Sequence, residues 1–204
     1  LHEARDWEGV AVLALRHAER LLDQGRGETL EAWLAGAPAK LLEDHPALLY
    51  WLGLSRLIGF PAESRPLLER ALHRFSAEAD PTWACLAWAA LVEAYIAEWN
   101  DFRLLDGLIE HFEAHFGPEL TLPSLELEGR MAAALGSALI MRRPDGPFTE
   151  MWLRRALDRT ASMGKASLKA KVYLMAAWYY FWMGDLAEAN VVCGELNRMA
   201  EQTD

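Results

Sequence analysis

Apolar residues recur at three- and four-residue spacing along almost the whole chain, which is the pattern of amphipathic α-helices. Glycines and prolines interrupt this pattern and cut the chain into pieces of helix length. No stretch of the sequence alternates apolar and polar residues for long enough to predict a strand. The pattern predicts an all-α fold of about ten helices, at 4–24, 28–36, 46–58, 62–78, 81–98, 101–116, 123–142, 148–163, 166–183 and 185–202.

Several of the predicted helices begin with a residue whose side chain can accept a hydrogen bond from the first turn. Asp80 stands before Pro81, which combines a capping residue with a proline at the first helical position. Four further N-caps are predicted, at Thr29, Asp101, Ser124 and Asp185. Most connections between the predicted helices are short, and short connections favour antiparallel helix hairpins.

The predicted hairpins repeat along the chain. In the second helices, similar segments begin at Leu67, Leu108 and Trp152, and more loosely at Val192. In the first helices, equivalent places are held by Leu52-Gly53, Val92-Glu93, Leu135-Gly136 and Ala176-Ala177. Both series advance in steps of about 40 to 44 residues, so two separate alignments give one period of about 41. This agreement predicts an α-solenoid of helix pairs over 1–204, taken as a single repeat domain.

The segment 184–189 (GDLAEA) resembles the turn of tetratricopeptide repeats, in which Gly-Asp closes the first helix and a small residue lets the second helix pack closely. The segment 99–102 (WNDF) resembles a degenerate copy of that turn. Gly53, Gly136 and Ala177 fall where such a repeat has a small residue in its first helix, although the standard repeat has about 34 residues. Longer repeats with segments like 51–56 and 66–72 resemble the helical middle region of bacterial signalling ATPases, including transcription activators of the MalT type.

The resemblance implies a regulatory array rather than an enzyme: a right-handed superhelix whose concave groove binds a protein segment, a neighbouring domain of the parent protein or a small-molecule inducer. The groove residues implied on the first helices are Tyr50, Leu54, Ala94, Ser137, Trp178, Phe181 and Trp182. In such proteins a nucleotide-binding module precedes the array and an output module follows it. We expect this segment, which begins at Leu1, to be a fragment of a larger protein.

Composition removes several function classes. The sequence has no Gly-x-x-x-x-Gly-Lys-Ser/Thr loop, so we expect no bound nucleotide and no cofactor. Thirty acidic against twenty basic residues give a net charge of −10, which argues against direct nucleic-acid binding and against an anionic membrane surface. The longest apolar stretch, Val172–Met183, is shorter than the ~18 residues of a membrane span, and no secretory leader is visible. We therefore expect a cytoplasmic protein.

Histidine and cysteine patterns offer little chemistry. His111 and His115 share one helical face, but a zinc protease would need Glu directly after the first His, and here Glu113 stands one position further on. We expect a solvated helix face and no metal site. Cys85 and Cys193 each replace a small core residue of the repeat pattern, and we expect both thiols to be buried and inert.

No catalytic constellation emerges from the remaining polar residues. The carboxylate pairs Glu126/Glu128 and Glu110/Glu113 lack any sign of the apolar pocket that would separate their pKa values. The candidate nucleophiles lack the strand-to-helix elbow of a hydrolase; these are Ser55, Ser137 and Ser162. We therefore expect no enzymatic activity. The neighbouring Arg142 and Arg143 suit a helix C-terminus, with binding of an acidic partner or phosphate as the alternative.

Aromatic residues gather in the predicted helix 166–183, where 178–182 reads WYYFW. Tyr180 falls on the predicted core face, whereas Trp178, Phe181 and Trp182 fall on the face that would line the groove. They are either an aromatic binding platform or a surface buried by neighbouring repeats. Two function classes stay open: a regulatory sensor region, and a free-standing adaptor that gathers partner proteins.

Overall fold

The computed structural model describes residues 6–116, 122–161, 163 and 166–202. These residues form eleven α-helices, one 3₁₀ turn and no strand, which confirms the all-α prediction. The helices are α1 (Trp7–Asp23), α2 (Gly27–Leu34), α3 (Ala39–Asp44), α4 (Pro46–Arg56), α5 (Pro61–Ala77), α6 (Pro81–Glu98), η1 (Phe102–Leu104), α7 (Leu105–His115), α8 (Leu125–Arg142), α9 (Thr149–Ala161), α10 (Ala166–Met183) and α11 (Leu186–Glu201). Within the described ranges, no helix has both the length and the apolarity needed to cross a membrane.

Two local details differ from the sequence prediction. The short helix α3 was not predicted, because six residues between Pro38 and His45 are too few to show a helical period. The predicted N-cap Thr29 is wrong, since it lies inside α2. The reason is a tight turn: Gly25 ends α1 with a left-handed φ of 68°, and α2 begins two residues later at Gly27.

The other predicted caps are confirmed. The side chain of Asp80 accepts a hydrogen bond from the Trp83 backbone N–H at 3.1 Å, and Pro81 is the first residue of α6. Asp101, Ser124 and Asp185 accept from backbone N–H groups at 3.0 to 3.1 Å. Four predicted helix starts are thus fixed by side chains that lie next to them in the sequence.

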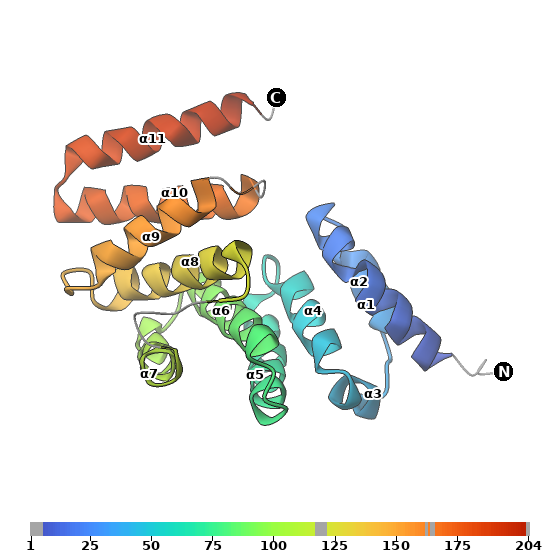
Figure 1. The fold of residues 1–204 in the computed structure, drawn as a ribbon. Coiled ribbons are helices and arrows are strands. Elements are labelled where there is room, and N and C mark those ends of the chain that lie inside the picture. The colour runs from blue at the N-terminus through green and yellow to red at the C-terminus, as the bar shows by residue number, and fades with distance from the viewer. Residues whose placement is uncertain (1–5, 117–121, 162, 164–165, 203–204) are drawn as a thin grey trace. The chain divides into compact units, whose positions relative to one another are not determined.

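The chain divides into two compact units, 1–100 and 101–204, and each is described by itself. In the first unit, α4, α5 and α6 pack in chain order, and α1, α2 and α3 pack on α4 (Figure 1). Because α4, α5 and α6 are joined by short turns and pack on their neighbours, they form antiparallel hairpins. Leu48, Tyr50, Leu68 and Trp88 fill the core of this unit and are at most 1% exposed.

In the second unit, α7 packs on α8, the α8–α9 hairpin packs on α10, and α11 packs on α10 (Figure 1). The shared core joins Ile140 of α8, Leu153 of α9, Ala176 and Tyr180 of α10 and Val192 of α11. Val192 is the buried residue of α11, so this helix is held to the unit through one side.

Two of the predicted small residues, Gly53 and Gly136, face the second helix of their hairpin. A Cβ atom built on Gly53 of α4 would lie 2.7 Å from the Cγ and Cδ2 atoms of Leu68 on α5. A Cβ atom built on Gly136 of α8 would lie 3.6 Å from backbone atoms of Leu153 on α9. Gly53 therefore sits where an added side chain would collide with the second helix, whereas at Gly136 an added Cβ would make an ordinary contact with the second helix.

Candidate functional site

Two of the three predicted groove residues of the first unit, Tyr50 and Ala94, are buried. Tyr50 is 1% exposed and packs edge-on against Trp51 and Trp83, with ring centroids 4.9 and 5.3 Å apart. Ala94 is fully buried and Leu54 is partly buried. The burial of Tyr50 and Ala94 assigns them to the core, because a partner cannot reach them there.

The predicted groove residues of the second unit lie on α8 and α10. Ser137 and Trp178 are partly buried, whereas Phe181 and Trp182 are 66% and 52% exposed. Tyr180 is buried, as the sequence predicts. Leu174, which is also exposed, continues the same row at helical spacing.

We call Leu174, Trp178, Phe181 and Trp182 the outward stripe of α10, because they lie opposite the face that packs on α8 and α9. The rings of Trp178 and Trp182 contact each other with centroids 5.9 Å apart. The structure thus brings three of the seven predicted groove residues together on one exposed helix face.

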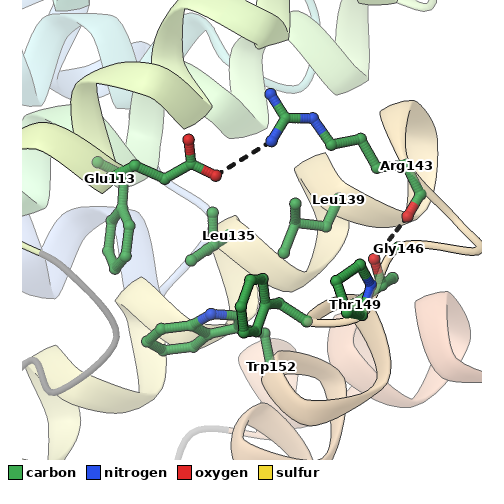
Figure 2. Close-up of a pocket in the computed structure, with 10 residues that line it drawn as sticks. Glu113, Leu135, Leu139, Arg143, Gly146, Thr149 and Trp152 are labelled. Carbon is green, nitrogen blue, oxygen red and sulfur yellow. Dashed lines mark hydrogen bonds and ion pairs between the residues drawn. The ribbon is translucent and has the colours of Figure 1, made fainter.

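A second candidate site, which the sequence did not predict, is a pocket of about 320 Å³ between α7, α8, α9 and the loop 143–148 (Figure 2). Its volume lies near the lower end of the range for small-molecule pockets, about 300–1,000 Å³. The lining is mostly apolar and includes Phe112, Leu135, Leu139, Phe148 and Trp152. A smaller depression in the first unit, of about 230 Å³, is lined by four apolar residues of α1 and α2.

The aromatic wall of the pocket is held by its own contacts. Phe112 of α7 and Trp152 of α9 meet edge to face with ring centroids 5.3 Å apart, and both side chains are almost fully buried. The guanidinium of Arg155 lies 4.8 Å from the centroid of the Trp152 ring, a cation–π contact. The wall is therefore held by contacts among side chains of the chain itself.

The loop between α8 and α9 is fixed at the backbone carbonyl of Arg143. That oxygen accepts a hydrogen bond from the Gly146 backbone N–H at 2.9 Å and from the buried Thr149 hydroxyl at 2.6 Å (Figure 2). A Cβ atom on Gly146 would approach the same oxygen to 2.9 Å. Position 146 therefore requires a glycine for this loop to close against the pocket.

One ion pair stands at the mouth of the pocket. Nη1 of Arg143 donates to Oε1 of Glu113 at 3.0 Å, and the two side chains are 41% and 54% exposed. Figure 2 shows Leu135 and Leu139 between this pair and the Trp152 ring. The pocket is thus an apolar cavity whose entrance carries one positive and one negative group.

Both arginines at the end of α8 bind carboxylates of α7. Arg142 holds Asp106 with two hydrogen bonds, Nε to Oδ1 at 2.9 Å and Nη2 to Oδ2 at 2.7 Å. This hydrogen bonding lowers the pKa of Asp106 below its ordinary value. Arg142 and Arg143 therefore tie α7 to α8, in addition to their position at a helix C-terminus.

The other polar candidates are accounted for by local pairing. The His111 and His115 rings stack with centroids 4.2 Å apart, and no cluster suited to a metal occurs in the described part of the chain. Burial and the neighbouring His115 lower the pKa of His111.

Of the four carboxylates considered for acid–base chemistry, three bind arginines. Glu126 pairs with Arg130 at 3.1 Å, and Glu113 pairs with Arg143 as described above. Glu128 pairs with Arg155 and Arg159. Burial opposes ionisation of Glu128, but the hydrogen bonds from its two arginines outweigh this effect and lower its pKa.

The two cysteines differ in environment. Cys85 is fully buried, and burial raises its thiol pKa to about 11, in line with the predicted inert thiol. The prediction for Cys193 is wrong, because this thiol is exposed. It lies on α11 next to Val192 in the sequence, and only the Val192 side faces α10.

The sequence analysis did not predict that the residues of the pocket lie together in space. Phe112 and Trp152 belong to the repeated pattern of the second helices, and Glu113 and Arg143 were each considered for another role. Because these residues are up to 40 positions apart, no local pattern could join them. The one usable signal was the run of two prolines and a glycine in 143–148, which marks a tight loop.

No family model matches the chain, and no curated protein or solved structure is significantly similar to it. The likeness to tetratricopeptide-type regulators therefore rests on sequence motifs, and a functional conclusion has to come from the surfaces of the chain itself.

Proposed function

We propose that this chain is a non-catalytic helical-repeat domain that binds a helical protein segment along the outward stripe of α10. The observation that carries the proposal is the exposure of Phe181 and Trp182, at 66% and 52%, in one row with Trp178 and Leu174. Large aromatic side chains are enriched at the centres of protein interfaces, where they bury much area at low entropic cost.

The internal repeat favours a helix as the occupant. One period of about 41 residues before Phe181 and Leu174 stand Ile140 and Ala133 of α8. Both are buried, and Ile140 belongs to the core cluster formed with α10. In the preceding repeat the position of Ile140 is thus packed against the next helix pair, and the outward stripe offers the equivalent position, Phe181, to a helix from a partner.

The exposed area is large enough to matter for binding. An aromatic side chain buries about 150–250 Å², so Phe181 and Trp182 each have roughly 100 Å² left to bury. At about 25 cal/mol per Å², the two rings together supply roughly 5 kcal/mol before the costs of association. We expect them to act as the anchors of the interface.

The wider role follows from the resemblance of the sequence to repeat regions of bacterial signalling ATPases and transcription activators. In that role the domain is a cytoplasmic right-handed superhelix of tetratricopeptide-like pairs, and the bound helix belongs to a neighbouring domain of the parent protein. Binding at α10 would then change how the array docks on that neighbour. The close approach at Gly53, the packing of Gly136 against α9 and the Gly184-Asp185 turn support this arrangement.

The proposal is tested with phage-displayed helical peptides selected against the intact chain. The selected peptides are measured on the wild type, on Phe181→Ala/Trp182→Ala, and on the matched control Ile58→Ala/Phe60→Ala. The control removes two residues of the first unit that are 94% and 61% exposed. We expect amphipathic helices to be enriched, and their affinity to fall at least tenfold, about 1.4 kcal/mol, on the double variant alone.

Two results would refute the proposal. One is the failure of any helical peptide to enrich on a chain that is folded by circular dichroism. The other is a set of peptides whose affinity is equal on the α10 variant and the wild type. Since the substituted side chains are exposed, loss of folding does not confuse either result.

A further inference from the structure

The pocket between α7, α8 and α9 has the features of a specific small-ligand site. Phe112, Leu135, Leu139 and Trp152 of its lining are buried, and Phe148 is exposed. The Phe112–Trp152 contact holds the aromatic wall, and the Arg143 carbonyl holds the loop. Walls that are held by their own contacts need little ordering when a ligand binds, so little binding energy is lost to it. At about 320 Å³ the pocket suits a ligand smaller than a drug-sized molecule.

The charges at the mouth restrict the chemistry of that ligand. Glu113 and Arg143 stand together at one end of an apolar cavity (Figure 2). An anionic ligand would bind Arg143 but would meet the Glu113 carboxylate, and a cationic ligand would meet the opposite difficulty. A ligand that carries both charges close together, next to an apolar group, satisfies both residues at once.

We propose that this pocket binds a hydrophobic α-amino acid. The carboxylate of the ligand binds the guanidinium of Arg143, its ammonium group binds the carboxylate of Glu113, and its side chain enters the cavity beside Leu135, Leu139 and Trp152. This site is separate from the helix-binding stripe of α10 and does not depend on it.

Opening the ion pair for such a ligand costs little. Both side chains are about half exposed, and ion pairs at such positions contribute little net stability. The hydrogen bond joins Nη1 to Oε1, while a guanidinium has five donors and a carboxylate two acceptor oxygens. Each group can therefore take a charge of the ligand, and charge-assisted hydrogen bonds are the stronger ones.

The experiment is isothermal titration calorimetry of the intact chain with L-leucine and L-phenylalanine. Three analogues test each part of the ligand: N-acetyl-L-leucine lacks the ammonium charge, L-leucine amide lacks the carboxylate, and glycine lacks the apolar side chain. We expect saturable binding of at least one of the two amino acids. Each analogue should bind at least tenfold more weakly, because each loses one of the three contacts.

Variants assign the binding to this pocket. Arg143→Gln, Glu113→Gln and Phe148→Ala change residues of the pocket that are between 41% and 55% exposed, so the fold should survive. We expect each to weaken binding of the amino acid at least tenfold. The matched controls Arg154→Gln, from the exposed Glu150–Arg154 pair, and Phe181→Ala should bind the amino acid like the wild type.

The inference fails if neither amino acid binds at millimolar concentration to a folded chain. It also fails if the analogues bind as well as the amino acids, or if the pocket variants leave binding unchanged. Phe148→Ala should leave peptide binding at α10 intact, and Phe181→Ala should leave amino-acid binding intact. The two sites can therefore fail or succeed separately.

Discussion

The hairpin α4–α5 depends on the absence of a side chain at Gly53. A methyl group there would lie 2.7 Å from two carbons of Leu68. Real Cβ atoms essentially never lie within 3.0 Å of a neighbouring heavy atom, so this contact cannot form without a shift. Leu68 is fully buried, and protein cores are close-packed, so its side chain must shift against neighbouring core atoms to admit the methyl group. The equivalent Gly136 of the α8–α9 hairpin is different, because its nearest neighbours would lie at an ordinary 3.6 Å.

The substitution of alanine for glycine should therefore have opposite effects on stability at Gly53 and at Gly136. Glycine in a helix interior is less favourable than alanine by about 1 kcal/mol, so both variants gain roughly this amount. Overpacking a core costs typically about 1–3 kcal/mol, and this cost applies to Gly53→Ala alone. We expect Gly136→Ala to be neutral or stabilising by up to about 1 kcal/mol. Gly53→Ala should be less stable than Gly136→Ala by roughly 2 kcal/mol.

Urea unfolding followed by circular dichroism measures this difference, provided that the slope of the transition is unchanged. A second arm uses Leu68→Ala, which removes the atoms that the new methyl group would meet. In that background Gly53→Ala should regain its helix-forming advantage, which a double-mutant cycle detects as coupling. Equal stabilities of Gly53→Ala and Gly136→Ala, or no coupling to Leu68, would refute the close approach of α4 and α5.

Three further predictions concern single residues. Ala79, two residues beyond the end of α5, has a left-handed φ of 55°, so Ala79→Gly should raise the unfolding free energy by roughly 0.5–1 kcal/mol; an unchanged urea midpoint would contradict this. A thiol reagent at pH 8 should modify Cys193 quickly in the native chain, because its thiol is exposed. Cys85 should react only after denaturation, because it is buried and its pKa is raised. Rapid reaction of both thiols in the native chain would contradict this. Glu128→Gln should destabilise the chain by about 1–3 kcal/mol at pH 7, because its two arginines lose a charged partner. Since the folded-state pKa of Glu128 is lowered, the wild-type advantage is present above the ordinary value of 4.5 and is lost as the pH falls through the lowered pKa; a difference that does not depend on pH would contradict the pairing.

The helical class and most helix starts could be predicted because they depend on residues close together in the sequence. A cap such as Ser124 or Asp185 binds a backbone N–H only three residues ahead, and the helical period repeats every few residues. The same locality explains the errors at the short α3 and at Thr29. The helix α3 has only six residues, and the start of α2 depends on the turn at Gly25. Both segments are too short to show a helical period in the sequence.

Burial and the candidate sites were decided by tertiary structure. The apolar period of a helix marks a face but does not say whether another helix covers it. Tyr50 and Phe181 were both predicted as groove residues, yet Tyr50 is buried against Trp83 and Phe181 is exposed. Cys193 is exposed although it lies beside the buried Val192.

The pocket is the clearest case of a site that local sequence patterns do not predict, because its walls come from three helices and a loop. Phe112 and Trp152 meet because α7 and α9 both pack on α8, and the loop between α8 and α9 is held at the Arg143 carbonyl. The sequence by itself determined the helices, because their hydrogen bonds and caps join near neighbours. Which faces are covered and which cavities remain was decided by packing between segments about 40 residues apart, a distance over which no periodic pattern specifies contact.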